Sequence, residues 1–521
     1  MTEYVIGANI LENLTTGMYK DSKVIYREYI QNSCDQIDKA IRNGILREGE
    51  GAIKIWLDNE KRVITIEDNA TGIPSTSFQR ILGNIADSDK KIGEDKGFRG
   101  IGRLCGLAYC KEVVFRSSAK GENTISTVIC DAKKMRDLIE EHQHGKKHTA
   151  NEMLHAINRF EEEKTYDVDS HFFRVELIDI NNENRDLLNL QEVKDYLSFV
   201  APVPYQNTFI YRTDVYNRAK ELGFRIDEYN IKLEGEQVFK KYSTDLKEPT
   251  GAKYDDIFGV HFKEFRDADE GLFVWMWVGL SKFKKAIPKA NHINQMRGLR
   301  LRKDNIQIGG EDSLQKLFKE DRGNSYFVGE VFAVSKDLIP NSQRDYFNEN
   351  AARVKFECEL RKYFNEYLQK LYREGSSINS AYKKIDTYKK KEVEFKEKEN
   401  ASSFVNKEHR EREFKIVDES KSEADSAKVE INKIKSKAND LLQKVITRIE
   451  DERSKSFIKG DSSYLNIQQQ EKVKSLHRAN KLSQYNRHEQ KLISKIYDLI
   501  LAATDRETAE LIITRIEEGL Q

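Results

Sequence analysis

Glu28, Asn32 and Asp35 are the residues whose types and spacing most directly indicate chemistry in this chain. They are four and three residues apart, so on an α-helix all three share one face across two turns. A carboxylate, an amide and a second carboxylate on one stripe suit a site that holds a metal-bound nucleotide and activates a water. A polar stripe by itself is more often the solvent-facing side of an amphipathic helix, so its meaning depends on the segments downstream.

A strand and a turn follow over residues 64–74. The apolar run that begins at Ile64 ends at Asp68, and Gly72 lies in the turn after it. A carboxylate at a strand end can accept a hydrogen bond from an exocyclic amine such as that of adenine. A glycine in the turn lets the backbone pass close to a flat base. The alternative is an ordinary Asp-Asn-x-x-Gly turn between two elements.

A glycine-rich run over residues 97–102, Gly-Phe-Arg-Gly-Ile-Gly, precedes an apolar segment that we expect to be helical. Backbone N–H groups in such a run, and at the start of a helix, can bind phosphate. Its spacing differs from that of a Rossmann fingerprint, and the sequence contains no GxxxxGK[ST] run. Residues 82–89, which include Ser88, are expected to end a helix with a glycine break shortly before this run.

These segments, in this order, resemble the GHKL ATPase superfamily. The matching stretches are the helix at 28–38, DNATG at 68–72, LGNIADSD at 82–89 and GFRGIG at 97–102. The resemblance extends over residues 1–180 and implies a Bergerat-type α/β sandwich that binds ATP with Mg²⁺ and hydrolyses the ATP. Two positions depart from the family pattern. Ala70 replaces the first glycine of DxGxG, and Phe172-Phe173 stand where the family often has Gly-Thr, whose threonine helps to bind adenine.

The resemblance implies a role for each matching residue. Glu28 is the general base, Asn32 holds Mg²⁺, Asp68 binds the adenine amine, and Asp35 steadies the helix face or a water. The glycine run forms a hinged lid over the phosphates, and phosphoryl transfer needs mainly such positioning and charge neutralisation. One side chain from the following domain reaches the γ-phosphate, with Gln295, Arg297, Arg300 and Lys303 as candidates. The expected nucleotide contacts are Asn32, Asp35, Asp68, Gly72, Ser88, Gly97, Arg99, Gly100, Gly102 and Arg297.

The elements that position these residues predict an α+β fold followed by a long all-α region. Strand-like runs alternate with helical patterns in the first two thirds, and the proline-free stretch after Pro340 favours long helices. We expect an ATPase domain over 1–185, an α/β domain resembling the transducer of MutL, gyrase and MORC-type proteins over 186–375, a helical or coiled-coil region over 376–460 and a helical interaction segment over 461–521. Apolar residues from Ala427 to Val445 alternate in steps of four and three, which predicts a coiled-coil seam or a helical hairpin.

The composition limits which cellular compartment and which classes of partner we expect for the chain. Its 88 Lys+Arg and 87 Asp+Glu leave a net charge of +1, so no overall field favours nucleic acid or a membrane surface. No apolar run approaches the roughly 20 residues that span a bilayer, and the first residues lack a signal-peptide pattern. Five cysteines without a CxxC pair favour reduced thiols. We expect a cytoplasmic protein without membrane contact. The basic cluster over residues 282–303 leaves nucleic-acid contact as an open alternative.

The favoured function is an ATP-driven conformational switch. ATP-dependent closure or homodimerisation would be transmitted to the helical tail, and a protein partner would bind through residues 376–521. DNA maintenance and anti-phage defence are settings suggested by analogy alone. Two alternatives remain: a nucleotide-gated scaffold or chaperone-like protein with little hydrolysis, and a kinase of the same superfamily. The kinase is disfavoured because no phospho-acceptor histidine helix precedes the ATPase segment, and because a base at Glu28 favours water as the acceptor.

Overall fold

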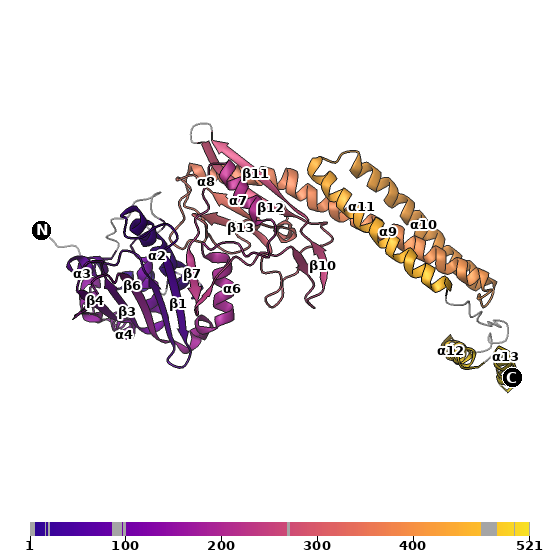
Figure 1. The fold of residues 1–521 in the computed structure, drawn as a ribbon, viewed down its shortest axis with the longest axis horizontal. Coiled ribbons are helices and arrows are strands. Elements are labelled where there is room, and N and C mark those ends of the chain that lie inside the picture. The colour runs from indigo at the N-terminus through magenta and orange to yellow at the C-terminus, as the bar shows by residue number, and fades with distance from the viewer. Residues whose placement is uncertain are drawn as a thin grey trace. The chain divides into compact units, whose positions relative to one another are not determined.

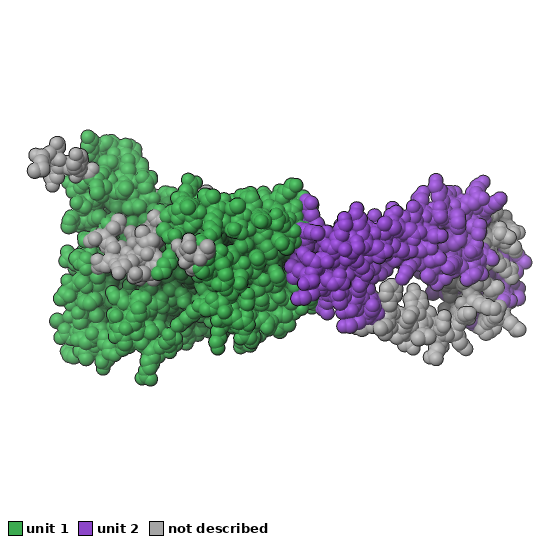
Figure 2. All heavy atoms as spheres, turned by 90° about the horizontal axis from the view of Figure 1, so that it is seen from above, with its two compact units in different colours: residues 1–281, 286–369 green, residues 282–285, 370–521 purple. Residues whose placement is uncertain are grey.

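The computed structural model describes residues 6–15, 17–18, 21–85, 96, 100–267, 271–469, 487–504 and 506–519. These residues divide into two compact units, which Figure 2 distinguishes by colour. Unit 1 contains residues 1–281 and 286–369, and unit 2 contains residues 282–285 and 370–521. The fold is α+β, as predicted: unit 1 combines β-sheets with helices, and unit 2 is helical (Figure 1).

The first sheet has eight strands in the order β5-β4-β3-β6-β2-β1-β7-β8. All neighbours pair antiparallel except β1 and β7, which are parallel. We call residues 6–237, which supply this sheet, the first-sheet region. Its strands are β1 (Ala52–Asp58), β2 (Val63–Asp68), β3 (Cys110–Ser118), β4 (Thr124–Asp131), β5 (Asn158–Lys164), β6 (Phe172–Ile180), β7 (Asn230–Leu233) and β8 (Glu236–Gln237).

Two strands of this sheet come from beyond residue 185, where we expected the ATPase domain to end. β7 pairs with β1, which places Asn230 opposite Ala52, and β8 forms a short hairpin with β7. The expected boundary therefore falls before the sheet is complete. The division into domains at 185, 375 and 460 remains a prediction, although the units separate at residue 369, close to the expected 375.

Helix α2 (Val24–Arg42) packs against the first sheet and carries the polar stripe. Its apolar residues, among them Ile25, Ile30 and Ile37, join one core with Ile55 and Ile64 of the strands. The other helices of this region are α1 (Asn9–Leu14), α3 (Ser75–Gly83), α4 (Ala132–Gln143), α5 (Ala150–Ile157), α6 (Leu190–Val200) and α7 (Arg212–Glu221), with 3₁₀ turns η1 (Gly102–Ala108) and η2 (Asn182–Leu188).

The second sheet has five strands in the order β11-β12-β15-β13-β14. We call residues 238–281 and 286–369 the second-sheet region. Residues 273–278, predicted as a buried strand, lie in β12, where Trp275 and Trp277 are fully buried. The strands are β11 (Gly259–Asp267), β12 (Gly271–Leu280), β13 (Gly298–Lys303), β14 (Ile306–Gln307) and β15 (Val328–Ala333), beside a two-stranded ladder of β9 (Asp245–Lys247) and β10 (Lys253–Asp256).

The remaining elements of unit 1 are short 3₁₀ turns and one helix. The turns are η3 (Gln315–Leu317) and η4 (Asp321–Tyr326). Helix α8 (Ala351–Tyr363) continues through a π-helical turn, η5 (Phe364–Leu368).

Unit 2 is built of helices α9 (Gln369–Asn400), α10 (Lys407–Lys435), α11 (Asp440–Gln469), α12 (Arg487–Ala503) and α13 (Arg506–Gly519). The periodic stretch from Ala427 to Val445 is not one continuous helix. A turn separates α10 from α11, and the Asn439 side chain accepts a hydrogen bond from the backbone N of Leu442, which caps the new helix. Of the two expected arrangements, the chain thus forms a helical hairpin at this point. Every helix in the part of the chain that the structure describes is too short or too polar to cross a membrane.

Candidate ATP-binding and hydrolytic site

The polar stripe on α2 faces the interior of unit 1. Glu28 is 6% exposed and Asp35 is 3% exposed, while Asn32 between them is half-buried. Burying a carboxylate is costly unless charges or hydrogen bonds compensate it, so two buried carboxylates on one face must have compensating partners. The solvent-facing interpretation of the stripe is therefore excluded.

Glu28 lies between two arginines and the glycine run. Its Oε1 is 3.2 Å from Nε of Arg344 and 3.6 Å from Nε of Arg27. Neither contact has hydrogen-bond geometry, and within the described residues Oε1 accepts no hydrogen bond. A Cβ added at Gly102 would lie 2.6 Å from Oε2. Glycine at 102 thus leaves room for the Glu28 carboxylate.

Asp68 is buried because it continues the inward face of β2. Strand residues alternate between faces, so Asp68 points to the same side as Ile64 and Ile66 and is 1% exposed. Ser33 of α2 donates to its Oδ2 at 2.7 Å, and the backbone N of Ala70 donates to its Oδ1 at 3.0 Å. Burial raises the pKa of Asp68 to about 7, although both hydrogen bonds act in the opposite direction.

The turn after Asp68 is packed against β3. Gly72 has φ +64°, and a Cβ there would collide with the backbone carbonyl of Ser118. Glycine is therefore required by this close approach as well as by its backbone conformation. Ala70 is fully buried in the core, which accommodates the extra methyl group. Phe173, which replaces the family's threonine, lies opposite Asp68 in the β2–β6 register and stacks on Phe115.

Lys96, which immediately precedes the glycine run, is held by groups from several elements. Its backbone N donates to Oδ1 of Asp35 at 2.8 Å, and its carbonyl accepts from Nε2 of Gln31 and from Nη2 of Arg344. Asp35 thus holds the backbone at the start of this run. Gln31 is a member of the site that the sequence did not reveal.

The Lys96 side chain makes a second set of contacts. Its Nζ lies 2.7 Å from Asp38 and 3.3 Å from Asp227. Burial disfavours the charge, but Tyr229, Asp227 and Asp38 together raise the pKa of Lys96 above its ordinary value, so it is a cation at neutral pH. Asp227 lies just before β7, so this ion pair joins the start of the glycine run to the side of the first sheet that β7 and β8 form.

The glycine run itself is described only in part. Ser88, Gly97 and Arg99 lie outside the described residues, so their expected nucleotide contacts remain predictions. Gly100 has φ +69°, and Gly102 begins the short 3₁₀ turn η1, whose Leu104–Ala108 segment is buried. The turn is tied to α2, because the Tyr29 hydroxyl donates to the carbonyl of Arg103 at 3.0 Å.

Comparison with known proteins agrees with this geometry. Residues 20–165 match the family described as histidine kinase-, DNA gyrase B- and HSP90-like ATPase. The N-terminal region is a GHKL-type ATPase domain. The chain also resembles the chaperone protein HtpG of Shewanella baltica (strain OS155), with 27% identity over 141 residues, and that of Shewanella pealeana, with 28%. These matches cover 24% of this chain and only 22% of each relative's length.

The second-sheet region meets the GHKL domain through an arginine that the sequence patterns did not indicate. Arg344 has φ +53°, is 8% exposed and contacts both Glu28 and the Lys96 carbonyl. Beside it, the carbonyl of Gln343 accepts from Nη2 of Arg27 at 3.1 Å. In the sequence, Arg344 lies in the polar segment 341–345 after Pro340. This segment has no periodicity and no motif that would distinguish Arg344 from its neighbours.

The four expected γ-phosphate candidates lie elsewhere. Nη1 of Arg297 donates to the carbonyl of Ile287 at 3.5 Å, and Gln295 donates to Asp195. Arg300 covers the ring of Phe199 and donates to Gln307, while Lys303 donates to the carbonyl of Ser335. These four side chains contact other residues of the second-sheet region or helix α6, whereas Arg344 contacts Glu28.

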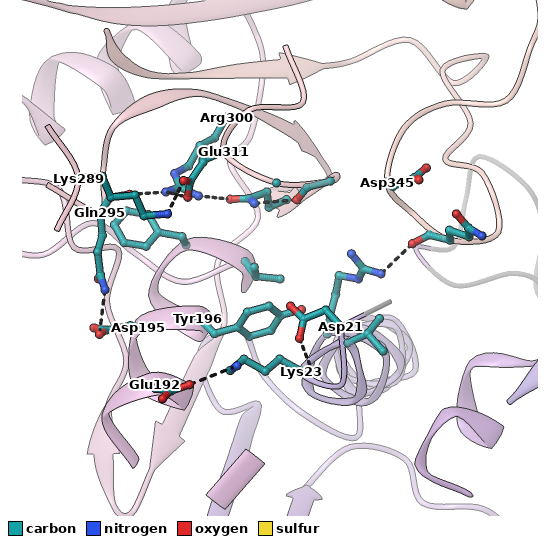
Figure 3. A pocket seen from close by; sticks show the side chains of 18 of the residues that line it. Asp21, Lys23, Glu192, Asp195, Tyr196, Lys289, Gln295, Arg300, Glu311 and Asp345 are labelled. Carbon is teal, nitrogen blue, oxygen red and sulfur yellow. Dashed lines mark hydrogen bonds and ion pairs between the residues drawn. The ribbon is translucent and has the colours of Figure 1, made fainter. Parts of the chain in front are cut away.

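A cavity of about 560 Å³ lies between α2, α6 and the second-sheet region (Figure 3). Most of its charges are paired: Lys23 with Glu192, Lys289 with Glu311, and Asp195 with Lys241. Glu28, Asn32, Asp68 and Gly72, which the resemblance assigns to the nucleotide site, do not line this cavity, although Arg27 beside Glu28 does.

The residues that the structure describes fit a magnesium nucleotide. A single amide oxygen, that of Asn32, suits Mg²⁺, which retains waters and phosphate oxygens in its octahedral shell. Asn32 lies on α2 between the buried Glu28 and Asp35, and Ser33 of the same helix donates to the buried Asp68 at the end of β2. Ser33 went unnoticed in the sequence because a hydroxyl on a helix carries no signal of which strand it will meet.

Proposed function

We propose that this chain hydrolyses ATP, with Glu28 as general base, Asn32 as the protein ligand of Mg²⁺ and Asp68 as acceptor for the adenine amine. The observation that carries the proposal is the environment of Glu28. The carboxylate is buried and lies within ion-pair distance of Arg344, its Oε1 accepts no hydrogen bond within the described residues, and its Oε2 lies beside Gly102. A structural salt bridge would use both oxygens in hydrogen bonds, whereas a general base keeps an acceptor for the water whose proton it takes.

In this mechanism, Glu28 orients a water and takes its proton as the water oxygen bonds to the γ-phosphorus. The electron pair of the breaking bond leaves with ADP. Arg344 stabilises the charge that develops, because a fixed cation beside a reacting phosphoryl group lowers the barrier. Bound Mg²⁺ would neutralise the phosphate oxygens. Asp35 acts through the Lys96 backbone, and Gly72 acts by allowing the turn to pack on β3.

The proposal also includes coupling between the two regions of unit 1. Arg344 comes from the second-sheet region and donates to the carbonyl of Lys96, immediately before the glycine run. Closure of that run over ATP would therefore depend on where the second-sheet region stands. This supports a conformational switch over a scaffold with little hydrolysis. Because the HtpG matches cover only a fifth of those chaperones, we do not extend their chaperone role to this chain.

Substitution of Glu28 tests the proposed base. We expect Glu28→Ala to reduce Mg²⁺-dependent phosphate release by about 10²–10⁴-fold, while the dissociation constant for ATP changes little. Glu60→Ala, in the exposed turn after β1, is the matched control and should keep full activity. Unchanged turnover in Glu28→Ala would exclude this residue as the base.

We further propose that ATP promotes self-association of a cytoplasmic protein. The five cysteines are free thiols, as suits a reducing compartment such as the cytoplasm.

Helix α12 exposes Leu492, Ile496 and Leu499, which share one helical face, and such a face favours a partner helix. Light scattering with a non-hydrolysable ATP analogue should show a dimer. A monomer at saturating analogue would count against closure by dimerisation.

A further inference from the structure

Unit 2 contains an open cavity of about 660 Å³ whose lining residues include five basic side chains. Three segments form it: helix α9, helix α11 and the short segment Lys282–Lys285, which belongs to unit 2 although it interrupts the chain of unit 1. The cavity is independent of the proposed ATPase site, since all of its lining residues belong to unit 2.

The charges of this cavity do not balance. Its basic lining residues are Lys282, Lys284, Lys383, Lys390 and Arg453, and its acidic ones are Asp386 and Glu452. Five cations against two carboxylates leave an excess of three positive charges. In a chain whose net charge is only +1, such a local excess is a specific feature of this surface.

Both carboxylates of the cavity are already engaged. Glu452 lies 2.5 Å from Nζ of Lys282 and 3.1 Å from Nζ of Lys284, and Arg453 binds Asp386 through both terminal nitrogens. Burial would raise the pKa of Glu452, but the two lysines lower it, so the carboxylate stays ionised and fixes Lys282 and Lys284 in place. The two carboxylates thus hold Lys282, Lys284 and Arg453, while Lys383 and Lys390 stay exposed, with Lys390 3.9 Å from the exposed Glu394.

The other basic residues of the 282–303 cluster do not contribute to a surface of this kind. Lys289 pairs with Glu311, Arg302 pairs with Glu330 in the core, and Arg300 is 3% exposed. The sequence cluster is thus divided by the fold. Only its first members join basic residues from α9 and α11, which lie about 100 or more positions later in the chain.

We propose that this cavity binds the phosphate backbone of a nucleic acid. Lys383 and Lys390 are exposed and lie seven residues apart on α9, a separation of about 10 Å along the helix axis. A single phosphate group cannot reach both, whereas a nucleic-acid strand carries a charge about every 3.4 Å along its axis. Lysines act as point charges without the planar fork that reads carboxylates or bases, so the contact is to backbone phosphate and independent of sequence.

Binding of labelled DNA tests this site in the full-length protein. Fluorescence anisotropy is measured with a duplex of about 20 base pairs and with a single strand, over a range of salt concentrations. We expect Lys383→Glu/Lys390→Glu to weaken binding at least about tenfold and to make the slope of log K against log salt shallower by roughly two. The matched control is Lys396→Glu/Lys428→Glu, which changes the net charge equally in unit 2 but outside the cavity.

Each outcome of this experiment either supports the nucleic-acid site or overturns it. Retained binding in the control, with an unchanged circular dichroism spectrum and unchanged basal ATP hydrolysis in both variants, would support the site. An equal loss in both variants would show a general charge effect and overturn it. Absence of salt-dependent binding, tighter binding of poly-glutamate than of DNA, or competition by inorganic phosphate as effective as that by the strand would also overturn it.

Discussion

Two groups of buried charges in unit 1 differ in how completely their partners satisfy them. In the second-sheet region, Glu330, Lys240 and Arg302 are all fully buried. Glu330 accepts from Arg302 at 2.7 Å, from Lys240 at 3.1 Å and from the Tyr205 hydroxyl, and Lys240 also donates to Asn305 at 2.6 Å. Both oxygens of the Glu330 carboxylate therefore accept hydrogen bonds from other residues of unit 1.

At the candidate site, Glu28 has cations nearby, but its Oε1 has no hydrogen bond in the described structure. The pKa values of Glu330 and Asp68 show a related contrast. Although burial opposes it, Arg302 and Lys240 lower the pKa of Glu330 to about 2, whereas burial without a cation raises that of Asp68 to about 7. Burial of charge therefore does not by itself identify a functional site. A buried carboxylate oxygen without a hydrogen bond, as in Glu28, or a buried carboxyl group without a neighbouring cation, as in Asp68, is the better indicator.

The largest expected effect is on stability, at Glu330. Replacing it with Ala leaves Lys240 and Arg302 buried without a counter-charge, which typically costs about 3–5 kcal/mol. We expect Glu330→Ala to lower the free energy of unfolding by this amount in urea denaturation, and Glu28→Ala by less than about 1 kcal/mol. Arg344 and Arg27 keep their backbone carbonyl acceptors when Glu28 is removed. Equal losses in the two variants would remove the distinction between the two carboxylates.

Arg344 should have the next largest effect, on turnover. We expect Arg344→Ala to lower kcat about 10²-fold with little change in KM, because the cation acts on charge that develops during the reaction. Arg344→Lys should recover only part of the activity, since one ammonium group cannot replace the fork that meets Glu28 and the Lys96 carbonyl. Arg297→Ala is the control and should keep its kcat. A loss confined to Arg297→Ala would instead favour the candidate proposed from the sequence.

Asp68 should show a smaller effect on stability than Glu330, and one of opposite sign. Its folded pKa of about 7 lies above the ordinary 3.8, so between these values the folded state holds a proton that the unfolded state has lost. Stability therefore falls as the pH rises through this range, and the penalty is complete above the folded pKa. Asp68→Asn removes it and should raise the free energy of unfolding by about 1–2 kcal/mol at pH 8.5, with a smaller gain at pH 5.5.

The same variant should lose ATP binding. With Ala70 N donating to the amide oxygen, and the Asn NH₂ directed at Ser33, no acceptor remains for the adenine amine. Isothermal calorimetry at pH 8.5 would measure the loss. A variant that is more stable and still binds ATP normally would show that Asp68 is structural, like Glu330.

Local patterns predicted the parts of the site that local structure determines. The spacing of Glu28, Asn32 and Asp35 predicted their shared helical face, and the apolar run from Ile64 predicted the strand that ends at Asp68. Partners from distant segments were not predictable in this way. Ser33, Gln31 and Arg344 reach the site through packing of α2 on the sheet and of the second-sheet region on α2, and no periodicity encodes those contacts. The sequence did not predict the turn between α10 and α11, because the apolar residues keep their spacing of four and three positions across it.

The parallel pairing of β7 with β1 has a consequence for fragments of this protein. A fragment that ends at residue 185, the expected end of the ATPase domain, would lack β7 and leave the backbone groups of β1 unpaired along one edge. Such an edge is a template for pairing with another chain, so this fragment should aggregate on expression. It would also lack Asp227, the ion-pair partner of Lys96. A fragment extended through Gln237 keeps both, and is the shortest one that we expect to remain monodisperse and to bind nucleotide.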